Sequence, residues 1–344
     1  MMKKFSAFIL VFAFALSMLA GCASSGTPAT SGPAGTSTDT SAASSSAPAK
    51  AMNWSLATSS SGSSPYMLGS IISNVVNEHQ DKVALSAQVS AGFNENLNLV
   101  TDGDAKVGLG TCLDLALAYT QKEGFEDEKF KKLRRISLYS IEYGHQIVRA
   151  DSGIKTLNDL VGKKVNINTP SSVTATRNKM LIAGMDRTLD EFKIFEIATS
   201  GAMDGLRDKT FDATFNGMSV GNSSVTELAS QIPVNLLDVP QDVFDKFNEL
   251  AGGAFGYGVI PAGSYNGQDA DCHTWVGYNM LYCRDDADEE AIYQITKAFW
   301  ENLQELAIAD TGFAILSEDM ITFGPDIPLH PGAERYLKEA GYIK

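Results

Sequence analysis

The chain contains 344 residues, of which 44% are hydrophobic, and it has a formal net charge of −14 at pH 7. The length allows two domains of ordinary size, and the apolar fraction is typical of a globular protein. The acidic balance, without any basic stripe, argues against nucleic acid as a partner. The cysteines are too few for a disulfide framework; they are Cys22, Cys112, Cys272 and Cys283.

Residues 1–21 have the pattern of a secretion signal. Lys3 and Lys4 precede an apolar segment, residues 5–19, that is too short to span a membrane, and no later apolar run is long enough. Residues 19–22 (LAGC) resemble the bacterial lipobox. The resemblance implies that Cys22 is lipidated and anchors an extracytoplasmic chain to the cell membrane, in the periplasm or at the cell surface. The alternative is a cleaved signal in which Cys22 is incidental. Residues 22–52 are expected to be a flexible tether, because Ser, Thr, Ala, Gly and Pro dominate them.

The first folded unit is expected to start with a strand at Trp54 and Leu56, a loop of only Ser and Gly at 59–64, and a helix from near Pro65. The start of a helix offers unpaired N–H groups that suit a carboxylate or phosphate. The alternative is an ordinary turn with a serine cap. The elements expected next are a strand at 83–89, a short helix around 97–100, a strand at 107–110, a helix through 115–119, a charged surface loop at 124–132, and extended segments at 136–140 and 146–148.

A second unit starts at Thr156, which together with Asp159 resembles a capping box. Small-residue loops follow at 169–172 and 217–224. The strands expected here are 163–168, 194–197, 213–215, 234–239, 254–260 and 276–283. The expected helices include residues 180–182, 202–207, 225–229, 243–250, 285–309 and 332–339.

Repeated strand–loop–helix units predict an α/β fold with mainly parallel sheets. Two sheets joined by two crossovers would form two lobes with a cleft between them. In open α/β sheets ligands bind at the carboxyl ends of the strands, and the Ser/Gly loops follow strands at that end. The sequence therefore predicts a binding cleft lined by small and hydroxyl-bearing residues.

Several segments resemble the TAXI family, the substrate-binding subunits of one class of TRAP transporters. Residues 62–69 (GSSPYMLG) and 95–100 (ENLNLV) are similar to its first loop and a following helix. Three longer segments match family motifs closely; they are 148–163 (VRADSGIKTLNDLVGK), 260–269 (IPAGSYNGQD) and 328–341 (PLHPGAERYLKEAG). The resemblance extends from about residue 53 to the end of the chain.

The resemblance implies a type II periplasmic-binding-protein fold, each lobe a mainly parallel sheet flanked by helices, with the ligand cleft between lobes. Lobe I is expected to comprise 53–145 and 257–344, and lobe II 146–256. The implied function is capture of a small carboxylate, such as glutamate, glutamine or 2-oxoglutarate, by hinge closure and its delivery to a TRAP-type permease. The resemblance implies neither a cofactor, a metal nor catalysis, and a monomer is expected.

Transferred position by position, the resemblance implies a ligand site held by backbone N–H groups and hydroxyls. The residues are Gly62, Ser63, Ser64, Tyr66, Asn94, Thr111, Ser171, Ser172, Thr174, Asn216 and Gly217. Ser63, Pro65, Thr111 and Ser219 depart from the usual family residues, and all four lie in ligand-facing loops. We therefore expect a ligand that differs from glutamate.

An enzyme is the main alternative. Residues 217–221 (GMSVG) fit the G-x-S-x-G pattern of serine hydrolases, with Ser219 as the nucleophile and later Asp and His residues as possible partners. The sequence lacks an HGGG-like segment for an oxyanion hole. A binding lipoprotein that serves a sensor is a further alternative.

Other chemistry-bearing residues have a functional and a structural interpretation. His145, Arg149 and Arg177 could pair with a ligand carboxylate, or serve in packing and salt bridges. A metal at residues 269–273 is disfavoured, because the spacing matches neither an EF-hand loop nor a zinc motif. Cys272 and Cys283 could form a disulfide outside the cytoplasm, which sequence alone does not decide.

Overall fold

The computed structural model describes residues 51–170 and 172–344. The expected signal peptide, the proposed lipid site Cys22, most of the tether and the candidate ligand residue Ser171 lie outside the described residues. The described residues belong to one compact unit, Pro48–Lys344. In this part of the chain, no helix combines the length and the apolar character that crossing a membrane requires.

Hydrogen bonds join the strands into one sheet of ten strands within the described residues. The sheet order is β2-β1-β3-β10-β4-β7-β5-β6, with β8 beside β4 and β9 beside β10. The strands are β1 (Met52–Ala57), β2 (Val83–Gln88), β3 (Val107–Thr111), β4 (Leu133–Arg149), β5 (Lys164–Asn166), β6 (Lys193–Phe195), β7 (Ala213–Met218), β8 (Val234–Leu236), β9 (Gly256–Ile260) and β10 (Cys272–Arg284).

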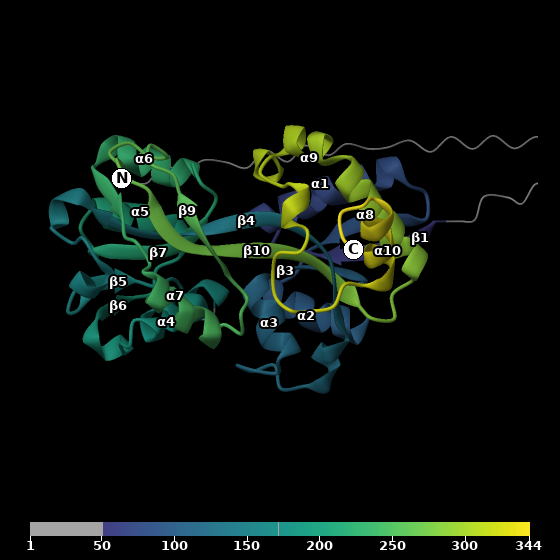
Figure 1. Cartoon of the computed structure of the whole chain (residues 1–344), viewed down its shortest axis with the longest axis horizontal. Coiled ribbons are helices and arrows are strands. Elements are labelled where there is room, and N and C mark those ends of the chain that lie inside the picture. The colour runs from purple at the N-terminus through teal and green to yellow at the C-terminus, as the bar shows by residue number, and fades with distance from the viewer. Residues whose placement is uncertain (1–50, 171) are drawn as a thin grey trace, which may run out of the picture. The chain divides into compact units, whose positions relative to one another are not determined.

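Two groups of parallel strands are linked by two long antiparallel ones. Strands β1, β2 and β3 pair in parallel, as do β5, β6 and β7, whereas β4 and β10 pair with each other in antiparallel fashion. Figure 1 shows β4 and β10 side by side between the two groups. We call the β1–β2–β3 side the first half and the β5–β6–β7 side the second half. The sequence predicted two sheets, and the β4–β10 pair connects them into one.

The two extended segments expected at 136–140 and 146–148 are one continuous strand, β4. Gly144 lies within this strand, between the two expected segments. A Cβ at Gly144 would collide with the Trp275 ring and the Thr274 hydroxyl of β10. The glycine therefore allows the Trp275 side chain to pack closely against the strand, and the chain does not turn there. The β4–β10 pairing also shifts register twice, between Asn279 and Met280 and between Leu281 and Tyr282.

The helices follow the expected order, with one correction. They are α1 (Ser64–His79), α2 (Phe93–Asp102), α3 (Cys112–Tyr119), α4 (Val173–Gly184), α5 (Thr199–Arg207), α6 (Ser223–Gln231), α7 (Gln241–Leu250), α8 (Glu289–Glu301), α9 (Leu303–Ala309) and α10 (Pro331–Glu339). The single helix predicted over 285–309 was wrong, because α8 and α9 are separate. Asn302 lies between them with φ −121° and ψ 30°, outside the helical region.

The predicted surface loop at 124–132 was wrong in part. Residues Glu128–Lys132 form a 3-10 turn, and Phe130 within it is buried. The Phe130 ring meets Phe125 edge to face at a centroid distance of 5.3 Å. Because charged residues dominate this segment, the sequence analysis did not recognise that Phe125 and Phe130 pack together within it.

Asn96 fixes the strand ends of the first half. Its side-chain amide donates to the carbonyls of Thr58 and Leu109, at 2.7 and 2.8 Å, and its oxygen accepts from the Ser90 hydroxyl at 2.6 Å. Thr58 directly follows β1, and Leu109 is in β3. One fully buried residue in the first turns of α2 thus joins the carboxyl ends of two parallel strands.

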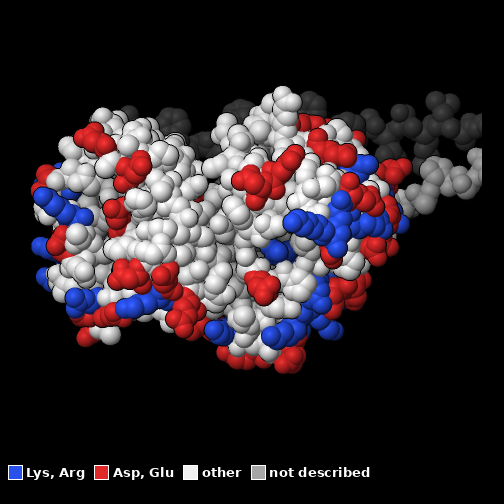
Figure 2. Space-filling view, viewed as in Figure 1, with Lys and Arg blue, Asp and Glu red and all other residues white. Residues whose placement is uncertain are grey.

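Charged residues are unevenly distributed on the surface. In the space-filling view of Figure 2, Lys, Arg, Asp and Glu gather toward the two ends of the face shown, and few of them lie over the middle of β10. The sheet is covered by apolar side chains that form a main core cluster and a second one around Phe211 and Leu228.

Candidate ligand-binding site

A crevice of about 530 Å³ draws its lining from both halves of the sheet. The first half contributes Asn94 and Asp114, and the segment from Glu123 to Phe130 forms one rim. The second half contributes Val173 and Thr176 from the first turn of α4. The candidate residue Asn94 therefore lies opposite the α4 start.

Thr111 and Asp114 form a capping box at the start of α3. The Thr111 hydroxyl donates to the Asp114 carboxylate at 2.9 Å and accepts from the Asp114 N–H at 3.2 Å. Both residues are buried. The Thr111 hydroxyl, which we expected to face a ligand, is thus bonded within the protein, while Asp114 itself borders the crevice.

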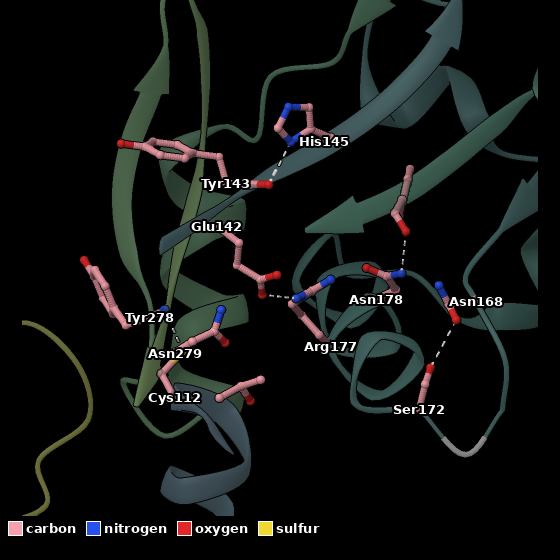
Figure 3. A network of polar contacts seen from close by, with 12 residues as sticks. Cys112, Glu142, Tyr143, His145, Asn168, Ser172, Arg177, Asn178, Tyr278 and Asn279 are labelled. Carbon is pink, nitrogen blue, oxygen red and sulfur yellow. Dashed lines mark hydrogen bonds and ion pairs between the residues drawn. The ribbon is translucent and has the colours of Figure 1, made fainter. Parts of the chain in front are cut away.

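An ion pair between Glu142 and Arg177 lies where the two halves meet. Glu142 is in β4, Arg177 is in α4, and Nη1 of the arginine lies 2.5 Å from Oε1 of the glutamate (Figure 3). The Arg177 side chain is 4% exposed and the Glu142 side chain 19%. The guanidinium also stacks over the Trp275 ring, 4.2 Å from its centroid. Arg177 therefore makes an internal salt bridge, which was the structural interpretation of this residue.

Gly217, another candidate residue, leaves space for this pair. A Cβ at Gly217 would collide with the Glu142 carboxylate and lie 2.8 Å from Nη1 of Arg177. Gly277 in β10 packs under the same glutamate, where a Cβ would lie 3.1 Å from Cγ. Gly217 in β7 and Gly277 in β10, on the two sides of β4, thus both leave room for the Glu142 side chain.

Several buried polar atoms around the pair have no hydrogen-bond partner among the described residues. They include Nε and Nη2 of Arg177 and Oδ1 of the neighbouring Asn178. The candidate residue Asn216 also has an unpartnered Oδ1, but its side chain points to the sheet face opposite to the one that Gly217 turns toward the pair. Buried polar groups are nearly always satisfied, so a cluster of unpartnered ones indicates a water or ligand site. Asn178 is held by its amide, which donates to the carbonyls of Ile167 and Phe215.

The remaining candidates occupy loop and cap positions. Ser63 caps α1 by accepting from the Tyr66 N–H at 3.4 Å, which agrees with the alternative interpretation of this loop, while Gly62 and Ser64 are exposed. Ser172 caps α4 by accepting from the Ala175 N–H, and its hydroxyl donates to Thr169 O at 2.7 Å. Thr174 follows in the first turn of α4 and is partly exposed.

His145 and Arg149 have structural roles. His145 is fully buried, with Nδ1 2.9 Å from the Tyr143 carbonyl and Nε2 2.7 Å from the Tyr265 hydroxyl. Because a carbonyl only accepts, Nδ1 carries the proton and Nε2 accepts from Tyr265. Arg149 pairs with Asp151 through two bonds of 2.8 and 2.9 Å.

The cysteines Cys112, Cys272 and Cys283 are free and buried, so the disulfide between the last two does not form. Both lie in β10, eleven residues apart, which at about 3.3 Å per residue separates them far beyond bonding distance. Ser219 shows no hydrogen bond from its hydroxyl to a histidine within the described residues. Its carbonyl oxygen instead lies 3.4 Å from the Tyr265 hydroxyl.

A family model described as NMT1-like matches residues 56–341. The chain belongs to the NMT1-like family. This assignment covers nearly the whole described part, including both halves, the crossing strands and the crevice.

Solved structures that this NMT1-like protein resembles in fold include solute-binding proteins. A Xanthomonas citri protein solved with bound ATP has 11% identity and a TM-score of 0.50, covering 85% of this chain and 97% of its own. The aliphatic sulphonate binding protein SsuA of Escherichia coli has 12% identity and a TM-score of 0.45, covering 83% of each chain. A probable amino-acid ABC transporter extracellular-binding protein of Bacillus subtilis, ytmK, has 12% identity and a TM-score of 0.46, covering 77% of this chain and 98% of its own. At such identities the likeness concerns the fold, which is the predicted one.

Two acidic residues of this NMT1-like chain were missed in the sequence: Asp114, which lines the crevice, and Glu142, which pairs with Arg177. Glu142 is the single acidic residue in an otherwise apolar and neutral stretch from Ile136 to Val148, which is the signal that could have identified it. Asp114 follows β3 by three residues, the capping-box distance, inside a run of apolar residues.

Two buried groups of the protein should respond to acid in opposite directions. Burial raises the pKa of Asp114 from 3.8 to about 6, so the folded state gains relative stability as the pH falls from 6 toward 4. Burial lowers the pKa of His145 from 6.5 to about 4, so stability is lost as the pH falls through the same range. Each effect is worth about 3 kcal/mol, and they largely cancel.

The variants Asp114→Asn and His145→Gln should separate these effects. In Asp114→Asn we expect the free energy of unfolding to fall more steeply than in wild type between pH 6.5 and 4. In His145→Gln we expect it to rise. Urea unfolding at several pH values measures both slopes. Equal slopes in the two variants would contradict the assignment.

Proposed function

We propose that this protein is an extracytoplasmic solute-binding protein that captures a small carboxylate between its two halves. The halves would close by bending at β4 and β10, and the loaded protein would deliver its ligand to a membrane permease. Family membership and the periplasmic-binding-protein fold support the general function. The three long TAXI-like segments support a TRAP-type permease, and the lipobox-like residues support an anchor on Cys22.

Arg177 carries the proposal of an anionic ligand. Its Nη1 is bonded to Glu142, but Nε and Nη2 are buried without a partner in the described chain. These two N–H groups form one edge of the guanidinium, which matches the two oxygens of a carboxylate. Arg177 belongs to α4, whose first turn lines the crevice through Val173 and Thr176. A ligand that enters when the halves separate would accept hydrogen bonds from Nε and Nη2 of Arg177, which have no partner among the described residues.

The sulphonate named for the Escherichia coli structure has an equally suitable pair of oxygens. Sulphonates therefore belong in a ligand screen beside carboxylates. A serine hydrolase built on Ser219 is the enzymatic alternative, and it would be marked by covalent labelling of Ser219 with a fluorophosphonate probe.

Binding should depend on Arg177 and not on a comparable arginine elsewhere. We expect Arg177→Met to weaken binding of the ligand at least about tenfold, as removal of a charge-assisted pair does. Arg187→Met is the control, because Arg187 pairs with Glu191 at 3.0 Å in an exposed salt bridge.

The ligand itself can be identified by native mass spectrometry of the protein purified without additions. A thermal-shift screen then tests glutamate, glutamine, 2-oxoglutarate and short alkanesulphonates. The proposal fails if only neutral sugars or cations bind, or if Arg177→Met and Arg187→Met bind alike. Strong stabilisation by glutamate, glutamine and 2-oxoglutarate alike would contradict the expected departure from glutamate-type ligands.

A further inference from the structure

Glu78, His79 and Glu305 form a compact group of metal-ligating side chains away from the crevice. One ligand atom from each residue, a ring nitrogen of His79 and one carboxylate oxygen of either glutamate, lies within 4.8 Å of the other two. We propose that these three residues bind a divalent transition-metal ion of the Zn²⁺ class. The crevice lining includes none of them, so this inference is independent of the proposed function.

Two helices bring the group together. Glu78 and His79 are the last two residues of α1, and Glu305 lies in α9. The two helices contact each other, and Figure 1 shows α9 just above α1. In the described part of the chain, no other set of three or more His, Cys, Asp or Glu residues comes together this closely. His79 and Glu305 are 226 positions apart, so no local spacing in the sequence indicates the group.

The negative charges of the group exceed its positive charge. Nε2 of His79 lies 2.8 Å from Oε2 of Glu305, and the imidazole compensates that carboxylate only when it is protonated. Glu78 adds a second carboxylate. Lys82, the next lysine along the chain, lies 3.8 Å from Asp288 instead. The carboxyl end of α1 adds partial negative charge at the same place, so a divalent cation would compensate charge that the protein leaves unbalanced.

The donor atoms select the class of ion. An imidazole nitrogen and carboxylate oxygens bind Zn²⁺ at about 2.0–2.2 Å, whereas Ca²⁺ and Mg²⁺ prefer sites made of oxygen alone. Two ligands of a tetrahedral Zn²⁺ ion then lie about 3.4 Å apart. Rotations of the side chains can bring the three atoms to this spacing, since His79 and Glu305 are 37% and 43% exposed. The ion binds Nε2 without its proton, any proton there passes to solvent, and water completes the coordination.

His79 is one of two histidines that an ion can reach from solvent. The sequence has four, of which His145 and His330 are buried. The other exposed one, His273, has its Nδ1 3.7 Å from a carboxylate oxygen of Asp238, and no second carboxylate completes a group around it. His273 therefore provides a matched control, because it is an exposed histidine beside one carboxylate instead of two.

Isothermal titration with ZnCl₂ of the untagged protein, freed of metal with a chelator, tests the site. His79→Gln should weaken zinc binding at least about tenfold, because it removes the nitrogen ligand. Glu78→Gln should weaken it too, which separates a metal site from a plain His79–Glu305 ion pair, in which Glu78 takes no part. His273→Gln should bind zinc within about twofold of wild type. Ca²⁺ and Mg²⁺ should bind far more weakly than Zn²⁺.

Thermal unfolding gives a second readout, because an ion held between α1 and α9 binds the folded state. With zinc at about a hundred times its dissociation constant, we expect the melting temperature to rise by about 4 °C. The rise should disappear in Glu305→Gln and persist in Glu334→Gln. Glu334 is the control because its side chain is similarly exposed, at 46%, and pairs with Lys338 at 2.8 Å. Unfolding curves without metal establish that all variants are folded.

Three results would overturn the inference. The first is zinc binding to His79→Gln, or to Glu78→Gln, that is as tight as binding to wild type. The second is equal affinity for Ca²⁺ and Zn²⁺, because the imidazole would then not be a ligand. The third is loss of zinc binding in His273→Gln, which would put the ion at the other exposed histidine. None of these results bears on ligand capture in the crevice, which is tested separately through Arg177.

Discussion

Glu142→Met is expected to lower the free energy of unfolding by about 3–5 kcal/mol. Arg177 would then remain 4% exposed, without the carboxylate that compensates its charge. Burying an unpaired guanidinium costs more than any packing gain from the methionine can offset, because the arginine cannot lose its proton. Chemical denaturation of the purified protein, followed by tryptophan fluorescence of the nearby Trp275, measures the loss.

A double-mutant cycle shows whether the loss belongs to the pair. Arg177→Met alone should be less damaging, about 2–3 kcal/mol, because Glu142 remains partly exposed. The double variant should lose less than the sum of the two single variants, by about 1–3 kcal/mol. Strict additivity would mean that the two side chains do not stabilise each other in solution.

Gly332→Ala should lower the free energy of unfolding by about 3 kcal/mol through overpacking. Gly332 in α10 lies directly against the backbone of α8. An added Cβ would collide with the Glu289 carbonyl and lie 2.8 Å from the Tyr293 nitrogen. These are backbone atoms, which cannot rotate away as a side chain does, so the two helices would have to separate.

The comparison for this variant is Gly201→Ala in α5. There the nearest atom to an added Cβ is the Ile197 Cγ2 methyl at 3.1 Å, which can move. Stability should be unchanged or raised by up to about 1 kcal/mol, since alanine favours a helix over glycine. If both variants had similar stability, the tight α8–α10 contact would not exist in solution.

Local patterns in the sequence predicted most helices and strands, and failed where distant packing decides. The helix at Pro65 was predicted from its proline and its apolar spacing, both of which are local. The continuity of β4 through Gly144 was missed, since the close packing at this glycine depends on Trp275, which is far away in the chain. The break at Asn302 was missed because the apolar pattern continues across it from α8 into α9.

The candidate site divides in the same way. Loop and cap positions such as Ser63 and Ser172 could be located from strand–loop–helix patterns. The hydroxyl of Thr111 was expected to face a ligand, yet a neighbouring carboxylate three residues on already binds it. Glu142 and Arg177 are 35 positions apart. No period or motif indicates such a pair, because it depends on how α4 packs against β4.

The continuity of β4 and β10 has a consequence for the thermodynamics of closing. Both connections between the halves are adjacent strands of one ladder, so neither can swivel independently of the other. The two halves can therefore move relative to each other mainly by bending and twisting of the β4–β10 ribbon. Two flexible linkers would lose far more conformational entropy on capture. A ribbon of this kind leaves a larger share of the contact energy available for holding the ligand.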